Sequence, residues 1–125
     1  MYTDEVPFHT TSETVGAAVV VHVTGELDLA TADELSDCLR GAVRSVGPLA
    51  PVVVDLTAVD FLGACGIGVL LDHQDMCLSK GSALMVVATT PAVLRPLQVL
   101  ELTELLGVRS CVPDALEAPG MSGRA

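Results

Sequence analysis

The chain lacks the residues that usually build an aromatic core. Among its 125 residues there is no tryptophan, one tyrosine and two phenylalanines, while half of the residues are apolar. A core must therefore come from valine, leucine, alanine and isoleucine, a mixture that suits helices packed on a short sheet. The length is that of one domain with a single core.

Positive charge is also scarce. Sixteen acidic residues against six lysines and arginines give a net charge of -10. Such a chain repels the phosphates of nucleic acids and of anionic lipid headgroups, so we expect neither as a partner. A protein with a basic face would instead associate with it faster.

Long apolar runs are missing as well, since none approaches the ~20 residues that span a bilayer. Residues Met1 to Glu5 lack the basic and apolar regions of a signal peptide. We therefore expect a cytoplasmic protein without membrane insertion, in which the cysteines are reduced. Their wide spacing offers no CxxC pair, so no metal site and no cofactor is predicted; the cysteines are Cys38, Cys65, Cys77 and Cys111.

Strands and helices alternate along the sequence. Short β-branched runs predict strands, the first two of them antiparallel because only residues 12–14 connect them. The predicted strands are Val6 to Thr11, Val15 to Thr24, Pro51 to Leu56, Ala83 to Ala88 and Val108 to Val112. We expect one domain over residues 1–117 and, from its Pro, Gly and Ser content, a flexible tail over residues 118–125.

Apolar residues at helical spacing predict three helices. The first begins at a capping box of Thr31 and Glu34 and ends before Gly47, and the third runs from Pro91 to about Leu100. The second ends at Lys80, and its predicted apolar stripe is Ile67, Leu70, Leu71, Gln74 and Leu78. Asp72, His73, Asp75 and Met76 are expected to face elsewhere.

The order of these elements predicts an α/β fold with a mostly parallel sheet. Parallel strands end at one edge of the sheet, so the loops 25–31, 57–66 and 89–90 are expected to lie near one another. The first loop contains Gly25-Glu26-Leu27-Asp28, and the second contains Gly63-Ala64-Cys65-Gly66 at the start of a helix.

These two turns, at this spacing, resemble the STAS family, small domains typified by bacterial anti-sigma-factor antagonists. In that family a Gly-[Glu/Asp]-Leu-Asp turn precedes the first helix, and Asp-Ser-Ser/Thr-Gly-[Leu/Ile]-Gly opens the second. The resemblance covers about residues 15–112, including the segment 102–108 near its end. It implies a single STAS-like domain: a mostly parallel mixed sheet of four to five strands with helices packed over it.

The second turn departs from the family pattern. Gly63 stands where the family has Asp, Ala64 where it has the first Ser, and Cys65 where it has the hydroxyl residue that a kinase partner phosphorylates. The resemblance therefore implies an altered switch, without phosphorylation at this turn. A thiol at a helix N-terminus can gain thiolate character, so Cys65 is either redox-responsive or an inert small residue.

Other features of the two turns have plainer interpretations. The glycines of the second turn lack the Gly-Lys-[Ser/Thr] of a phosphate-binding loop, so packing explains them better. Glu26 and Asp28 have no nucleophile or metal cluster beside them; we expect Asp28 to hold its turn and Glu26 to present charge to a partner. His22 is expected to be a satisfied, half-buried histidine of a strand.

The resulting functional hypothesis is a non-enzymatic anti-sigma-factor antagonist, which binds a serine-kinase-like anti-sigma factor and releases a sigma factor. No catalytic residue is assigned, and the predicted partner-binding residues are Glu26, Asp28, Gly63, Ala64, Cys65 and Gly66. An alternative is a STAS accessory subunit of a lipid or anion transporter ATPase. A third hypothesis, a thiol enzyme, would depend on Cys65.

Overall fold

The computed structural model describes residues 7–117, which form one four-stranded sheet in the order β1-β2-β3-β4. β1 pairs antiparallel with β2, and β2, β3 and β4 pair in parallel. The strands are β1 (His9–Val15), β2 (Ala18–Leu27), β3 (Pro51–Leu62) and β4 (Ala83–Val87). The predicted mostly parallel mixed sheet is confirmed, while the expected tail over residues 118–125 lies outside the described range.

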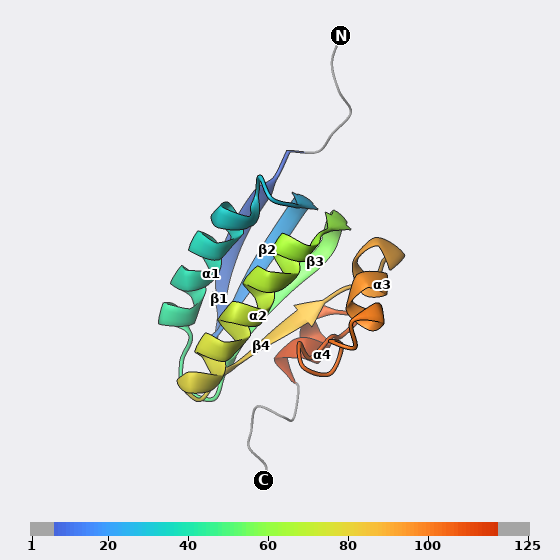
Figure 1. Ribbon diagram of the computed structural model, residues 1–125. Helices are drawn as coiled ribbons and strands as arrows, with labels where there is room; N and C mark the ends of the chain where they lie inside the picture. Colours follow the sequence, from blue (N-terminus) through green and yellow to red (C-terminus); the bar gives the residue numbers. More distant parts are fainter. Residues whose placement is uncertain (1–6, 118–125) are drawn as a thin grey trace.

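Within residues 7–117, four helices accompany the sheet, and Figure 1 shows their arrangement. They are α1 (Ala32–Ser45), α2 (Ala64–Ser79), α3 (Pro91–Val99) and α4 (Val112–Leu116). α1 and α2 lie side by side across one face, and α4 lies against the other (Figure 1). Within residues 7–117, no helix is both long and apolar enough to cross a membrane.

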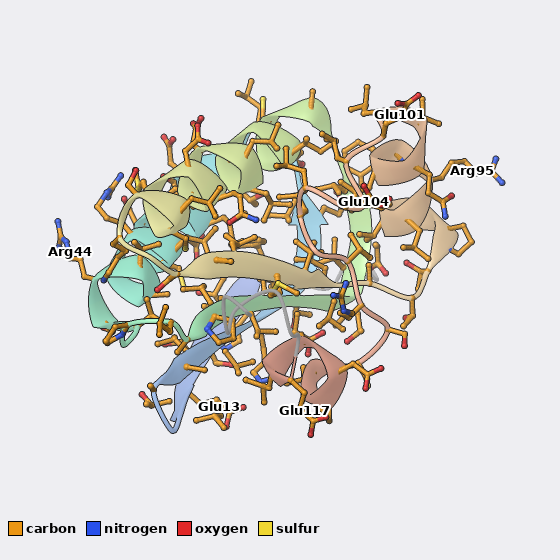
Figure 2. All side chains as sticks on the ribbon, turned by 90° about the horizontal axis from the view of Figure 1, so that it is seen from below. Glu13, Arg44, Arg95, Glu101, Glu104 and Glu117 are labelled. Carbon is orange, nitrogen blue, oxygen red and sulfur yellow. The ribbon has the colours of Figure 1, made fainter. Side chains whose placement is uncertain are left out.

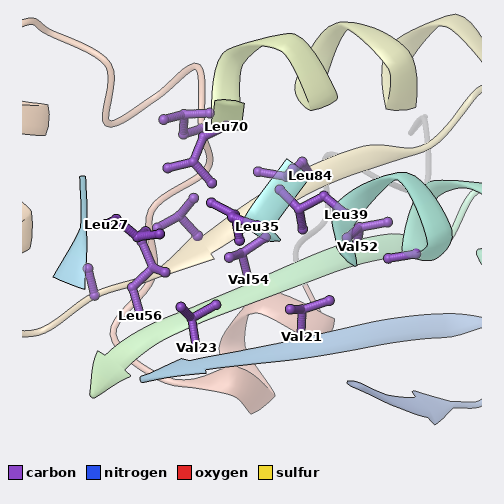
Figure 3. Close-up of a cluster of buried hydrophobic side chains, with 14 of the residues drawn as sticks. Val21, Val23, Leu27, Leu35, Leu39, Val52, Val54, Leu56, Leu70 and Leu84 are labelled. Atoms are coloured by element: carbon purple, nitrogen blue, oxygen red, sulfur yellow. The ribbon is translucent and has the colours of Figure 1, made fainter. Parts of the chain in front are cut away.

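Strand alternation divides the apolar side chains between two cores. The larger core lies between the sheet and the helices α1, α2 and α3, and its fully buried leucines and valines are shown in Figure 3. The smaller core lies under α4 and contains Val20, Val53, Met85, Val87 and Ala115. The strands β2, β3 and β4 are therefore buried on the face toward α1, α2 and α3 and only partly covered on the other, while β1 is largely exposed.

The first hairpin is displaced from its predicted position. Residues 12–14, expected to connect two strands, belong to β1, and the chain turns at Gly16 and Ala17. Gly16 has φ 60, the left-handed conformation that two-residue hairpin turns require at their first position. The sequence gives no apolar alternation for this part of β1, because both faces of the strand are largely exposed and carry threonine and serine.

The third strand is longer than predicted. β3 continues past Leu56 to Leu62, so residues 57–62 extend the sheet instead of forming a loop. The last β4 pair joins Asp55 to Val87, seven residues before Leu62. The 89–90 loop therefore leaves the sheet before the end of β3, and α3, which follows this loop, contacts β3.

The predicted fifth strand is also wrong. Arg109 makes an isolated parallel bridge with Val87, and Val112 already begins α4. Pro113 favours this start, since proline fits the first turn of a helix.

The apolar face of α2 is rotated from the predicted stripe. Leu78 is 54% exposed, whereas Cys77 is fully buried and His73 is 2% exposed. His73 Nδ1 donates to the carbonyl of Val69 at 2.8 Å, which satisfies one of its ring nitrogens. Gln74 does lie on the buried face, and its side-chain amide bonds the backbone of Leu84 in β4.

Candidate partner-binding surface

The two turns singled out by the sequence lie next to each other at the carboxyl ends of β2 and β3. Glu26 is paired with Phe61, and Leu27 with Leu62. Beyond the last pair, the backbone N–H of Gly63 donates to the carbonyl of Leu27 at 2.8 Å. We call the surface formed by residues 26–30 and 61–66 the joined-turn surface.

Asp28 and Thr31 hold the first turn together. Asp28 Oδ1 accepts hydrogen bonds from the backbone N–H of Ala30 at 3.0 Å and of Thr31 at 3.2 Å. Thr31 Oγ1 accepts from the N–H of Asp28 at 3.0 Å and donates to the carbonyl of Glu26 at 2.7 Å. The predicted turn role of Asp28 agrees with this geometry.

The predicted capping box of Thr31 and Glu34 is wrong. Thr31 is the N-cap residue of α1, but its side chain makes no capping bond to the helix. Its hydroxyl is already engaged by the turn, and Glu34 is exposed. The Thr31 hydroxyl therefore forms hydrogen bonds within the turn, whereas the sequence pattern predicted that it would cap the helix.

The second turn opens α2 with two exposed residues. Gly63 is the N-cap with φ -94 and ψ 177, an extended conformation that any residue can adopt. Ala64 and Cys65 follow as the first two helical residues, and both are exposed. The turn therefore presents a methyl group and a thiol at the protein surface.

Gly66 is buried where α2 meets the strand ends. A Cβ at this position would lie 3.0 Å from Leu27 Cβ and 3.0 Å from Leu62 Cδ1. A side chain would push α2 away from β2 and β3, so the glycine permits the close approach that joins the turns. This contact supports the packing interpretation of the glycine.

The joined-turn surface combines acidic and apolar groups. Leu29, at the tip of the first turn, is 80% exposed, and Phe61 is 49% exposed beside the second. Glu26 is exposed as well, and residues 25–36 and 57–68 contain no lysine, arginine or histidine. Such a surface fits a partner that has a basic rim and an apolar centre.

Leu29 and Phe61 were missed by the sequence reasoning. Both lie within the two turns but were not among the predicted partner-binding residues, which were chosen for charge and for the family pattern. The signal that could have found Leu29 is its place inside a tight turn between Asp28 and Thr31, where the side chain has no core to enter.

The four cysteines differ in their surroundings, and all are free. Burial raises the pKa of the Cys77 thiol to about 11, against a smaller opposing effect of Lys80. Cys77 is thus an inert core thiol, while Cys38 is half-buried and Cys65 and Cys111 are exposed. Within residues 7–117, no group of three potential metal ligands is assembled.

His22 lies between two carboxylates on the sheet face opposite α1 and α2. Its Nδ1 is 2.8 Å from Asp55 Oδ2, and its Nε2 is 2.8 Å from Glu13 Oε2. The hydrogen bond with Glu13, followed by that with Asp55, raises the pKa of His22 against a lowering by burial. The prediction of a satisfied, half-buried histidine agrees with this geometry.

The same cluster affects Asp55. Partial burial acts to raise the pKa of Asp55, but hydrogen bonds from the backbone N–H and hydroxyl of Thr57, together with His22, bring it below its ordinary value. Asp55 is thus ionised at neutral pH and can hold a protonated His22.

We expect His22→Gln to destabilise the protein more at pH 5.5 than at pH 8.5. The raised pKa of His22 means that its stabilising effect is complete below the ordinary pKa of 6.5 and is lost as pH rises through the folded-state value. Because the cluster is partly exposed, the maximal loss should be at most about 1 kcal/mol. Urea unfolding at both pH values measures it, with the exposed His9→Gln as control; an equal loss at both pH values would contradict the expectation.

Together these features define an α/β domain that presents a charged turn and a helix N-terminus as one surface. The family model of the STAS domain matches residues 9–115, so the chain belongs to the STAS domain family.

Several proteins of known name are similar to the chain. The anti-sigma-F factor antagonist RsfA of Mycobacterium tuberculosis is 29% identical over 102 residues, which are 82% of this chain and 80% of RsfA. RsfB of the same organism, also an anti-sigma-F factor antagonist, is 33% identical over 97 residues, 78% of this chain and 77% of RsfB. The crystal structure of an anti-sigma factor antagonist from Mycobacterium paratuberculosis matches with a TM-score of 0.81 and 31% identity, covering 90% and 93% of the two chains.

Proposed function

We propose that this chain is a non-enzymatic, cytoplasmic antagonist of an anti-sigma factor, and that it docks through the joined-turn surface. The observation that carries the proposal is the junction at Leu27 and Gly63, which brings an acidic turn and an exposed helix N-terminus into one contact area. The names of the mycobacterial relatives support the same function. Docking would occupy the anti-sigma factor and release its sigma factor.

The chemistry of this surface suits a serine-kinase-like partner with a basic face. The chain carries a net charge of -10, and the joined-turn surface contains no cation. Glu26 supplies exposed charge, while Leu29 and Phe61 supply apolar area that association would remove from water. Charge would speed the encounter, and the apolar side chains would slow dissociation.

We further propose that the antagonist is not switched off by phosphorylation of its second turn. Ala64 and Cys65 offer no hydroxyl group, and Gly63 offers no carboxylate. Cys65 is exposed, so its thiol remains open to oxidation as an alternative means of adding bulk or charge to the same surface.

The test is direct binding to the purified anti-sigma factors of the source organism. We expect Leu29→Glu to weaken binding by about 2 kcal/mol, because it places a charge where an apolar contact is buried. Leu49→Glu is the matched control, since Leu49 is 63% exposed but precedes β3 at the opposite end of the strand. Binding of none of the anti-sigma factors, or an equal loss in both variants, would contradict the proposal.

A further inference from the structure

The two edge strands of the sheet, β4 and β1, differ in whether another segment covers their outer backbone groups. Along β4, the segment that follows α3 covers the outer edge. The N–H of Val86 donates to the carbonyl of Leu106, the N–H of Arg109 donates to the carbonyl of Val86 at 2.9 Å, and the N–H of Ala88 donates to the carbonyl of Arg109 at 3.0 Å. Along β1, no element within residues 7–117 pairs with the outer edge. Alternate backbone N–H and C=O groups of β1 therefore face outward.

β1 carries few of the features that protect an exposed edge. Its seven residues pair with β2 in an unbroken register and contain no proline, no lysine and no bulge. Its one acidic side chain, Glu13, is bonded to His22 of the neighbouring strand and so lies across the sheet. The edge is thus regular enough to accept a further strand.

A groove of about 420 Å³ runs beside this edge, between β1 and α1. Residues 12–14 line it from the strand, and Asp37, Cys38, Gly41 and Ser45 are among those that line it from the helix. Two lining residues carry a carboxylate: Asp37, which is bound to Arg40 Nη1 at 2.8 Å, and Glu13, whose side chain lies on the other face of the sheet against His22. Arg40 and Arg44 do not line it, and Figure 2 shows Arg44 pointing away from the sheet.

We propose that the β1 edge and this groove form a docking site for an extended, basic peptide segment of another protein. The segment pairs with β1 as an additional strand, and its backbone satisfies the outward N–H and C=O groups. Because side chains alternate along a strand, every second residue enters the groove near Asp37, and the others lie on the opposite face near Glu13. Because both carboxylates are largely exposed, a cationic side chain can share Asp37 with Arg40 on one face and Glu13 with His22 on the other.

The net charge of the chain favours a basic peptide over a second copy of the chain as the occupant of this edge. Two copies pairing through β1 would bring together two molecules of net charge -10 and two copies of Glu13. A basic segment gains the same backbone hydrogen bonds together with an attractive field. The edge lies apart from the joined-turn surface, because the groove begins at the middle of α1 and extends toward its C-terminal end.

Gly41 provides a variant that blocks the groove without harming the fold. A Cβ at Gly41 would meet no atom within 4 Å, and the residue lies inside α1, where any ordinary side chain improves on glycine. Gly41→Arg fills the groove and adds a positive charge that repels a basic peptide. Gly41→Ala raises only the helix propensity of α1 and leaves the groove open. Gly68→Arg is the charge-matched control, since Gly68 lies in α2 and its Cβ position is also open.

The probe is a synthetic peptide of alternating threonine and lysine, labelled for fluorescence anisotropy. We expect it to bind wild type, Gly41→Ala and Gly68→Arg alike, and Gly41→Arg about tenfold more weakly. Added salt should weaken binding, and hydrogen exchange should show new protection of β1 amides. The same peptide N-methylated at alternate residues should not bind.

Three results would overturn the proposal. These are no binding at millimolar peptide, equal binding to Gly41→Arg, and binding without protection of β1 amides. If sedimentation shows that the free protein is a dimer that Gly41→Arg dissociates, the occupant is a second copy and the peptide assignment is wrong.

Discussion

Replacing Gly66 by valine is expected to lower the free energy of unfolding by about 1–3 kcal/mol, the usual cost of overfilling a packed core. The Cβ alone would lie 3.0 Å from Leu27 and from Leu62, and both of these side chains are buried. The strain would be relieved by moving the start of α2 away from β2. Because this movement separates the two halves of the joined-turn surface, partner binding should fall as well.

The matched control is Gly68→Ala, two residues further along the same helix. Its Cβ would meet nothing within 4 Å, so the substitution should raise the free energy of unfolding by about 0.5–1 kcal/mol through the helix propensity of alanine. Urea denaturation measures both changes, and titration with the anti-sigma factor measures binding. Equal effects of the two substitutions would show that Gly66 is not selected by packing.

The sequence is sufficient to predict the order of the elements and the meeting of the two turns. The runs Pro51 to Leu56 and Ala83 to Ala88 are almost entirely apolar, as parallel strands buried on both faces are, and alternation with helices then fixes a mostly parallel sheet. In such a sheet the ends of β2 and β3 must lie together. The residue pattern alone therefore assigns Glu26, Asp28 and Gly63 to one edge.

The errors fall where the local pattern is polar or ambiguous. Residues 12–14 of β1 and 57–62 of β3 are strand residues with largely exposed side chains, so hydrophobic periodicity carries little signal for them. The phase of α2 is ambiguous because this helix is apolar on several sides, and only its packing against the sheet separates buried Cys77 from exposed Leu78. The hydroxyl of Thr31 could either cap α1 or bond to the preceding turn, and in the structure it bonds to the turn.

The double substitution Gly63→Asp, Cys65→Ser is expected to create a phosphorylatable turn in a protein that, by our proposal, takes up no phosphate there. Gly63 has φ -94, so aspartate meets no backbone strain, and aspartate is a favoured N-cap residue. Its Cβ would approach the Phe61 ring at 3.0 Å, but this ring is half exposed and can move. The variant should therefore fold as well as wild type.

Incubation with the partner kinase and ATP, followed by mass spectrometry, tests the switch. We expect no phosphate on residues 63–66 of wild type and one phosphate on the hydroxyl that the double variant carries at position 65. The phosphate adds about -1.5 to -2 charges to the joined-turn surface and should weaken binding by about 3 kcal/mol, on the scale of a lost hot-spot residue. Cys111→Ser, which makes the same change at another exposed cysteine, should stay fully active.

The same proteins separate a permanently active antagonist from one controlled by oxidation. Cys65 is exposed at the second position of α2, so diamide treatment should lower the partner affinity of wild type, and reductant should restore it. Cys65→Ala should be insensitive to both, whereas Cys111→Ser should respond as wild type does. If oxidised and reduced wild type bind equally well, Cys65 serves only as a small residue that cannot be phosphorylated. In that case neither phosphorylation nor oxidation of the second turn would switch the proposed antagonist off.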